Sequence, residues 1–296
     1  MTMELPDWLP EGHIVRIPGR GEVFVRVHHH PDPSGPVVLL LHGWTASADT
    51  QFLYALQTLT DRYSIIAVDH HGHGRGLRSP RPFSLDEVAD DAAFVVRALG
   101  VDRVVTVGYS MGGPVSLQLW QRHPDLVAGM VFQATALEWR QQWSDRAKWR
   151  LVPLVGPALR SWWYPRMVRS ALRRLAATNA ELERWLAWVT VETLRNDPVT
   201  IASAGRALSR YDARPWAGDI AVPTDVLLTT RDRLVKPAKQ RALAETVRAE
   251  VFEVRADHLC ALSHPGSFGQ ATRAAVDSVA ARVTPPDRVP VVPIPG

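Results

Sequence analysis

Short apolar runs rich in β-branched residues recur along this chain, and most of them end at a glycine, an aspartate or a threonine. Continuous runs of this kind are typical of strands that are buried on both faces of a parallel sheet. Between the runs the hydrophobic pattern is that of helices, and this alternation predicts a parallel sheet with helices on both faces. The predicted strands are residues 37–41, 65–68, 104–107, 126–132, 225–229 and 250–255, and the predicted helices are residues 49–62, 84–99, 111–122, 238–248 and 265–282.

Two further strands precede this series. Residues 14–17 and 23–28 flank a Pro-Gly-Arg-Gly turn, which predicts an antiparallel pair at the start of the chain. The fold class expected from the whole pattern is therefore α/β, with a mostly parallel central sheet.

The rhythm of strands and helices stops between residues 137 and 211, where the pattern is helical, is interrupted by prolines and lacks a strand signal. A length of 296 residues suits one large domain that carries an insertion. We therefore expect a core of residues 1–136 and 212–284 and an inserted helical lid of residues 137–211. Residues 285–296 are rich in Pro and Val without periodicity, and a loosely held tail is expected there.

The composition argues against several other classes of protein. No apolar run reaches the roughly 18 residues of a membrane span, and the first twelve residues lack the features of a signal peptide. The single cysteine, Cys260, excludes an intrachain disulfide, so a cytoplasmic protein is the simplest expectation. The net charge of +4 is small for this length and no basic run is present, which indicates no binding to nucleic acid.

A serine follows the third strand of the parallel series. Gly108-Tyr109-Ser110-Met111-Gly112 fits the pattern G-x-S-x-G between an apolar strand and a helix. Small residues on both sides permit a sharp turn that exposes the Ser110 hydroxyl and directs the next helix N-terminus towards it. We interpret Ser110 as a nucleophile; the alternative is a glycine-rich turn with an idle serine.

A serine nucleophile needs a base within hydrogen-bond reach, and the base needs an acid that orients it. Asp232 and His258 follow the last two predicted strands, in the order serine, acid, histidine that this architecture favours. Loops after parallel strands share one edge of the sheet, so these residues can meet Ser110. Glu138 is the alternative acid and His264 the alternative base, whereas Asp257 is expected to point away from the site.

The turn His42-Gly43-Trp44 ends the first parallel strand. The backbone N–H groups of Trp44 and Met111 are predicted to form an oxyanion hole, because acyl transfer needs fixed donors that face the developing negative charge. The alternative is a glycine turn that only ends a strand.

Histidines cluster at positions 28–30 and at positions 70, 71 and 73, in spacings that zinc sites also use. No cysteine accompanies them, and the carboxylates nearby are interpreted as turn residues. We therefore predict neither a metal site nor a cofactor.

Five segments in this order resemble the α/β-hydrolase superfamily, in its lid-bearing branch. They are the turn at His42, the loop from Asp69 to Gly76, the motif around Ser110, the stretch from Ile220 to Pro237, and the His258 region. The resemblance spans about residues 14 to 282 and supports the Ser110, Asp232 and His258 assignment. The chain departs from the family pattern at Thr229, where a glycine is frequent, and at His71 and Gly76, where Arg and Ser are frequent.

The predicted lid is rich in tryptophan and in positive charge. It holds seven of the eleven tryptophans, and its thirteen basic and six acidic residues give it a net charge of +7. One interpretation is that the tryptophans fill the core beneath the lid and the arginines are solvated. The other is an aromatic, basic surface that admits apolar acyl groups or makes weak contact with an anionic membrane surface. On this second interpretation Trp44, Tyr109, Trp139 and Trp143 contact the substrate.

The function predicted from the sequence is that of a serine hydrolase, which cleaves a small carboxylic ester with an apolar acyl part through an acyl-enzyme. Two other functions stay open. The same triad could act on a C–C, thioester or lactone bond or in perhydrolysis, and the fold could serve as a ligand-binding receptor with little turnover. The sequence predicts no oligomeric state.

Overall fold

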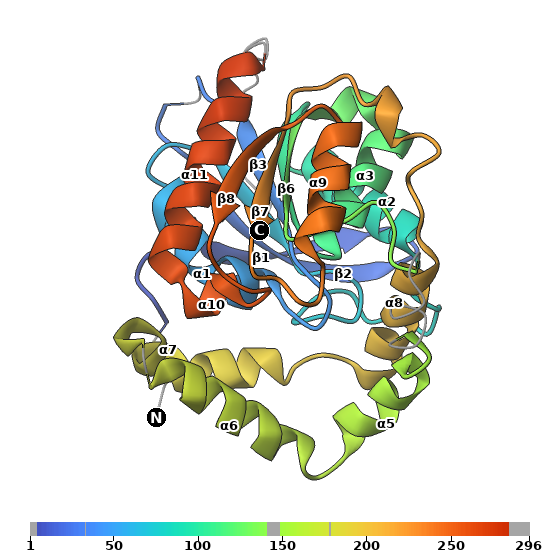
Figure 1. Ribbon diagram of the computed structural model, residues 1–296, viewed down its shortest axis with the longest axis vertical. Helices are drawn as coiled ribbons and strands as arrows, with labels where there is room; N and C mark the ends of the chain where they lie inside the picture. The colour runs from blue at the N-terminus through green and yellow to red at the C-terminus, as the bar shows by residue number, and fades with distance from the viewer. Residues whose placement is uncertain (1–4, 33, 141–148, 178, 284–296) are drawn as a thin grey trace.

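An eight-stranded sheet runs through the centre of the computed structural model (Figure 1), which describes residues 5–32, 34–140, 149–177 and 179–283. The strands lie in the order β1-β2-β4-β3-β5-β6-β7-β8. The β1–β2 and β2–β4 pairs are antiparallel and the other pairs are parallel. The strands are β1 (Glu11–Ile17), β2 (Gly21–His28), β3 (Val37–Leu41), β4 (Ile65–Val68), β5 (Val104–Tyr109), β6 (Val127–Gln133), β7 (Thr224–Thr229) and β8 (Glu250–Val254).

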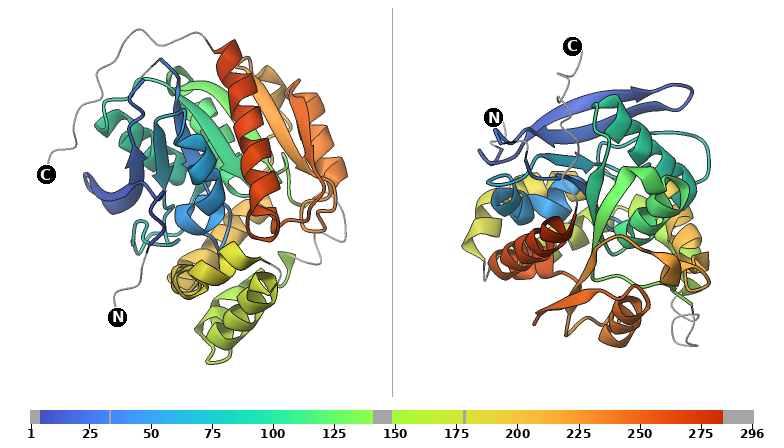
Figure 2. Two further views of the ribbon diagram at one scale, coloured as in Figure 1. Left: turned by 90° about the vertical axis from the view of Figure 1, so that its left-hand side faces the viewer. Right: turned by 90° about the horizontal axis from the view of Figure 1, so that it is seen from above.

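Helices cover both faces of the sheet (Figures 1 and 2). The longer ones are α1 (Ala48–Leu59), α2 (Leu85–Ala98), α3 (Gly112–Arg122), α9 (Pro237–Thr246) and α11 (Pro265–Arg282), and short turns are η1 (Pro124–Leu126), η3 (Ala217–Asp219) and α10 (Cys260–Ser263). Every strand and helix predicted in the core is confirmed within three residues at each end. The α/β fold class with a mostly parallel sheet is therefore confirmed.

The residues of β3 show how the two faces are built. Side chains of a strand point alternately to opposite faces. Val38 and Leu40 accordingly pack with the apolar residues of α1 and α11, whereas Leu39 and Leu41 pack with those of α2 and α3. All four are fully buried, and each such side chain contributes about 1.5–3 kcal/mol of hydrophobic stabilisation.

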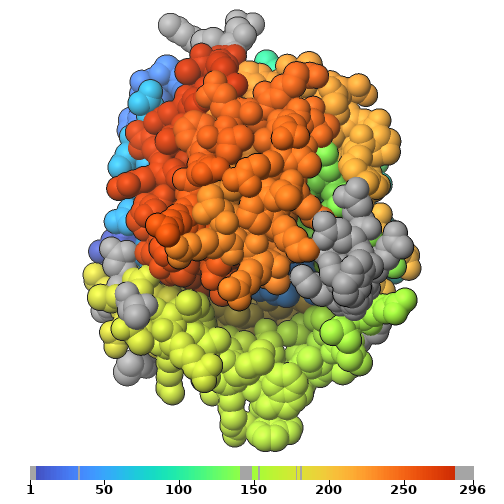
Figure 3. Space-filling view, in the orientation of Figure 1, coloured from blue at the N-terminus to red at the C-terminus, as the bar shows by residue number. Residues whose placement is uncertain are grey.

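Between β6 and β7 the described chain is helical. This segment contains η2 (Val152–Leu154), α5 (Val155–Arg160), α6 (Tyr164–Ala176), α7 (Ala180–Thr193) and α8 (Pro198–Arg210), and it forms the lower end of the molecule in Figure 3. We call these elements the inserted helices. An isolated antiparallel bridge joins Glu138 to Asp212, and the Ala213 N–H donates to the Leu137 carbonyl at 2.9 Å. The segment therefore leaves and rejoins the core at one place.

The inserted helices contact three loops that follow strands of the parallel series. The Trp44 indole N–H, after β3, donates to the Ile201 carbonyl of α8 at 2.9 Å. The Asp197 N–H donates to the Gly72 carbonyl, after β4, at 2.8 Å. Asn179 donates to the Leu262 carbonyl of α10 at 3.1 Å. All three contacts are at the carboxyl edge of the sheet.

None of the helices in the described chain combines the length and the apolar character that a bilayer span requires. The predicted tail of residues 285–296 and the predicted substrate contact Trp143 lie outside the described residues.

Candidate active site

Ser110 occupies the tight turn between β5 and α3. Its φ of 51° is in the left-handed region, which costs about 1–3 kcal/mol for a residue with a side chain. The surroundings fix this turn, because the Ser110 N–H donates to the Gln133 carbonyl at 2.9 Å and its carbonyl accepts from Thr135 Oγ1 at 2.7 Å. The conformation places the hydroxyl at the carboxyl edge of the sheet, beside the first turn of α3.

Gly112 provides the space for this turn. A Cβ atom on Gly112 would lie 1.9 Å from the Leu41 carbonyl oxygen and 3.0 Å from that of His42. These atoms belong to the backbone of β3 and of the turn that follows it, so they cannot move aside without displacing the sheet.

We expect Gly112→Ala to lower the free energy of unfolding by about 1–3 kcal/mol or more, because overpacking a rigid site forces backbone shifts. Urea unfolding followed by circular dichroism measures this. Gly218→Ala is the matched control, because a Cβ there meets no atom within 4 Å, and its stability should stay within about 0.5 kcal/mol of the original chain. Equal stability of the two variants would show that the turn tolerates a side chain.

Three side chains from different loops meet at this turn. His258 Nε2 lies 3.0 Å from Ser110 Oγ, and His258 Nδ1 lies 2.6 Å from Asp232 Oδ2. His258 follows β8 and Asp232 follows β7, so the parallel sheet brings both loops to the end of β5. The residues predicted as nucleophile, base and acid therefore form one hydrogen-bonded chain.

The Asp232 carboxylate is buried and held by its own loop. Its Oδ1 accepts from the N–H groups of Leu234 at 2.8 Å and Val235 at 2.9 Å. Its Oδ2 also accepts from Thr229 Oγ1 at 3.0 Å. Thr229, which departs from the family pattern, thus contributes a hydroxyl donor to the acid.

The fully buried Gln240 of α9 supports the same carboxylate. Its Nε2 lies 3.4 Å from Asp232 Oδ2 and donates to the Val235 carbonyl at 2.8 Å. Its Oε1 accepts from the Thr229 N–H at 3.0 Å. This buried amide fixes the loop that carries Asp232, a role that the sequence pattern did not predict.

Glu138, the alternative acid, and His264, the alternative base, interact with other residues, and so does Asp257. Glu138 Oε1 pairs with Lys239 Nζ at 2.8 Å. Asp257 accepts from the Leu259 N–H at 2.9 Å, and His264 Nδ1 lies 2.9 Å from Ser263 Oγ. None of the three is hydrogen-bonded to Ser110 or His258 in the part of the chain that the structure describes.

Tyr109 lies beneath the site rather than at its surface. Its ring is 1% exposed and packs edge-on against Phe268 of α11. Its hydroxyl donates to the His258 carbonyl at 2.8 Å and lies 3.3 Å from Cys260 Sγ. The prediction that Tyr109 contacts the substrate does not fit this position; the tyrosine supports the His258 loop from below. Burial raises the pKa of the Cys260 thiol to about 12, so this cysteine stays protonated.

The turn after β3 lies directly against Ser110. A Cβ on Gly43 would be 3.3 Å from Ser110 Cβ and 3.4 Å from the Tyr109 carbonyl oxygen. The backbone N–H groups of Trp44 and Met111 have no acceptor among the described residues. Met111 directly follows Ser110 and Trp44 directly follows Gly43, so these two N–H groups are free to donate to an oxygen atom of a bound molecule.

Aromatic side chains link this turn to the inserted helices. The Trp44 ring lies 5.9 Å from the Trp149 ring, which lies 6.3 Å from the Trp139 ring. The Trp149 indole N–H donates to the Trp139 carbonyl at 2.7 Å. Trp139 is 8% exposed, so it belongs to the core of this junction.

The histidines that follow β3 and β4 pack as neutral side chains. His42, His70 and His73 are buried against one another, and burial lowers all three pKa values, that of His42 to about 4. Among the described residues no group of three or more His, Cys, Asp or Glu side chains could hold a metal ion.

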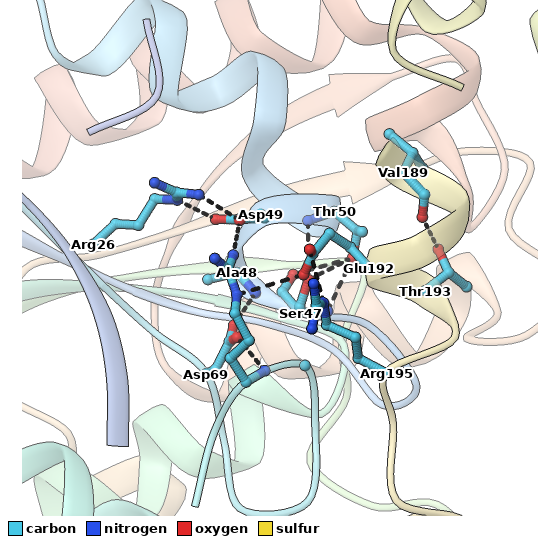
Figure 4. Close-up of polar contacts among 12 residues, drawn as sticks. Arg26, Ser47, Ala48, Asp49, Thr50, Asp69, Val189, Glu192, Thr193 and Arg195 are labelled. Atoms are coloured by element: carbon cyan, nitrogen blue, oxygen red, sulfur yellow. Dashed lines mark hydrogen bonds and ion pairs between the residues drawn. The ribbon is translucent and has the colours of Figure 1, made fainter. Parts of the chain in front are cut away.

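A buried network of charges fixes the loop after β4 (Figure 4). Asp69 Oδ1 accepts from the Ala48 N–H at 2.8 Å, and its Oδ2 accepts from the Arg75 N–H at 2.8 Å. Burial raises the pKa of Asp69 to about 7. Asp49 pairs with Arg26 and Arg75, and Arg75 Nε lies 3.5 Å from Glu192 Oε2 of α7. The network thus joins the sheet edge, α1 and the inserted helices.

Comparison with known proteins gives the family. Residues 36–265 match the model of the alpha/beta hydrolase fold. The chain therefore belongs to the α/β-hydrolase fold family.

Related proteins are named for different activities. The chain is 29% identical over 250 residues to a pimeloyl-[acyl-carrier protein] methyl ester esterase from Chromobacterium violaceum, which covers 80% of this chain and 92% of that protein. It is 35% identical over 98 residues to a 2-(acetamidomethylene)succinate hydrolase from Mesorhizobium japonicum, covering 33% of this chain and only 35% of that protein. The matches of highest identity thus span less than half of the length of those relatives.

Solved structures share the fold at low identity. A hydrolase from Pseudomonas aeruginosa superposes with a TM-score of 0.75 at 19% identity, covering 90% of this chain and 98% of that one. An esterase from Exiguobacterium antarcticum gives a TM-score of 0.75 at 19% identity, covering 90% and 100%.

Proposed function

We propose that this protein hydrolyses carboxylic esters through an acyl-enzyme formed on Ser110. The observation that carries the proposal is the chain of hydrogen bonds from Ser110 Oγ to His258 Nε2, at 3.0 Å, and from His258 Nδ1 to Asp232 Oδ2, at 2.6 Å. Both distances are within the range of hydrogen bonds, so a proton can pass from Ser110 to His258. The esterase named among the relatives supports the same reaction class.

In the first half of the reaction Ser110 Oγ attacks the ester carbonyl while His258 Nε2 takes the hydroxyl proton. The tetrahedral intermediate collapses, the C–O bond to the alcohol breaks, and His258 gives the proton to the leaving alcohol. In the second half His258 takes a proton from water, which attacks the acyl group and releases the carboxylic acid and free Ser110. Asp232 keeps the Nδ1–H tautomer in place throughout.

The N–H groups of Trp44 and Met111 are proposed to hold the oxyanion. Each lacks an acceptor among the described residues, and the Gly43 turn lies against Ser110. A single oxyanion donor is worth about 2.7–4 kcal/mol of transition-state stabilisation in enzymes of this type. The mechanism uses side chains, backbone and water only.

We propose further that residues 137–211 form a lid on a core of residues 1–136 and 212–284. The bridge between Glu138 and Asp212 supports these boundaries, and the contacts with loops after β3, β4 and β8 support a position above the Ser110 edge. Trp44 and Trp149 are partly buried with their rings 5.9 Å apart, and we propose that they contact an apolar acyl group, whereas Trp139 is buried in the core beside them.

Initial rates on p-nitrophenyl esters of rising acyl length test the proposal. We expect saturable turnover that depends on acyl length. An apolar acyl site favours longer chains until the chain fills the site. Fast cleavage of lactones, thioesters or diketones with no ester turnover would assign the triad to another bond. Tight binding of these compounds without any turnover would indicate a receptor.

A further inference from the structure

The helix α6 has two faces of opposite character. Val168, Leu172 and Ala176 are buried and pack on Trp185 and Trp188 of α7. In the left view of Figure 2, α6 lies on the outer side of the inserted helices, away from the sheet. Its other face is therefore presented to the surroundings of the protein.

That outer face is an arginine stripe, which consists of Arg166, Arg169, Arg173 and Arg174. Their spacing of three, four and one places them along one side of a helix. With Ser170 and Ala177 they line a shallow groove of about 480 Å³. All four arginines are exposed.

Many arginines of the core pair with carboxylates. Arg20 pairs with Asp91 and Glu87, and Arg122 pairs with Asp90. Among the described side chains, no carboxylate pairs with an arginine of the stripe; Arg166 contacts only Trp162, through its carbonyl and its ring. The stripe is thus a concentration of positive charge without an ion-paired carboxylate among the described residues.

Exposed apolar side chains adjoin the stripe. The turn between α5 and α6 is the lowest point of the ribbon in Figure 1, and it carries Trp162, which is 76% exposed, and Trp163, which is 41% exposed. Met167, one residue beyond Arg166, is 50% exposed, and Leu151 and Leu154 are exposed as well. We call Trp162, Trp163 and Met167 the apolar tip.

The tryptophans of the inserted helices therefore divide into two groups. Trp139, Trp185 and Trp188 are buried and fill the core, as the first sequence interpretation expected. Only Trp162 and Trp163 are exposed among the tryptophans of the described part of this segment, and both are beside the arginine stripe.

We propose that the apolar tip and the arginine stripe bind a membrane surface that carries anionic lipid headgroups. Tryptophan suits the boundary between an apolar and a wet phase, and arginine pairs with phosphate while its stem packs on apolar surface. A free phosphate ion engages the stripe only and leaves the apolar tip in water. A bilayer engages both, and this binding does not depend on the reaction that Ser110 performs.

Co-sedimentation with vesicles tests the proposal. One vesicle is phosphatidylcholine alone, and the other is phosphatidylcholine with phosphatidylglycerol, each at low and at high salt. We expect the intact chain to bind only the anionic vesicles, and less at high salt, because exposed charges are screened beyond roughly 8 Å at physiological ionic strength. The variant R169Q/R173Q/R174Q should bind at least tenfold more weakly, and up to roughly 100-fold if each arginine contributes fully.

Two controls sharpen the test. The variant R97Q/R103Q/R241Q removes the same charge from exposed sites of the core and should bind within about twofold of the intact chain. Trp162→Ala should weaken binding severalfold, and Trp162→Leu, which keeps an apolar side chain, should weaken it less. Unchanged thermal midpoints show that losses of binding are not losses of fold.

Three results would overturn the proposal. The first is equal, negligible binding to both vesicles at low salt. The second is unchanged binding by R169Q/R173Q/R174Q. The third is binding of polyglutamate as tight as that of anionic vesicles and insensitive to Trp162→Ala, which would assign the stripe to an acidic protein partner.

Discussion

Ser110→Ala is expected to reduce kcat for ester hydrolysis by roughly 10⁴- to 10⁶-fold while the chain stays folded. Among the described residues the Ser110 hydroxyl is the only hydrogen-bond partner of His258 Nε2, so its loss should remove the proposed covalent route as a whole. The side chain is small and its backbone is fixed by Gln133 and Thr135, so the turn should persist. Initial rates on a p-nitrophenyl ester, together with thermal unfolding, measure both effects.

Ser263→Ala is the matched control for this prediction. Ser263 lies on α10 near the His258 loop, and among the described residues its hydroxyl hydrogen-bonds only to the Leu259 carbonyl and the His264 ring. The kcat of Ser263→Ala should stay within about twofold of that of the original chain. Activity of Ser110→Ala within tenfold of the original would contradict the assignment of the nucleophile.

Asp232→Asn is expected to reduce kcat by roughly 10³- to 10⁴-fold. In the proposed mechanism His258 keeps its proton on Nδ1, so that Nε2 can accept the proton of Ser110. The carboxylate accepts that Nδ1–H at 2.6 Å, whereas an amide nitrogen in its place favours the other tautomer. Initial rates measure the effect, and an unchanged thermal midpoint separates it from loss of the fold.

Glu138→Gln is the comparison variant, because Glu138 is the acid that the sequence left as an alternative. Its carboxylate pairs with Lys239 and does not reach His258. We expect kcat within about tenfold of the original and some loss of stability, because a largely buried ion pair is broken. If Glu138→Gln were the crippling change and Asp232→Asn were mild, the acid would follow β6 instead of β7.

The core of the fold and the three residues at Ser110 could be predicted because their signals are local. A strand, a glycine-flanked serine and a helix follow one another within a few residues, and Asp232 and His258 each follow a strand directly. The topology of a parallel sheet then places all three at one edge. That step needs only that the strands are parallel, because the loops that follow parallel strands share one edge of the sheet.

Tyr109 was misplaced although a signal was present. Val105 and Val107 of β5 point to the face covered by α1 and α11, so alternation places Tyr109 on that same face, beneath His258. Alternation along the strand was therefore the better guide than nearness to Ser110 in the sequence.

Two other features depend on tertiary packing that no local pattern reveals. Gln240 reaches Asp232 only because α9 packs beside the loop after β7. The division of the tryptophans into buried and exposed groups depends on how α6 packs on α7, which leaves Trp162 exposed and covers Trp188.

The most direct measurement of the central claim is the mass of the chain after reaction with a fluorophosphonate, followed by peptide mapping. The account predicts one adduct, on the Ser110 hydroxyl oxygen with fluoride as the leaving group, with no adduct in Ser110→Ala and a much slower reaction in Asp232→Asn. An adduct on another residue, or an equal adduct in Ser110→Ala, would contradict it.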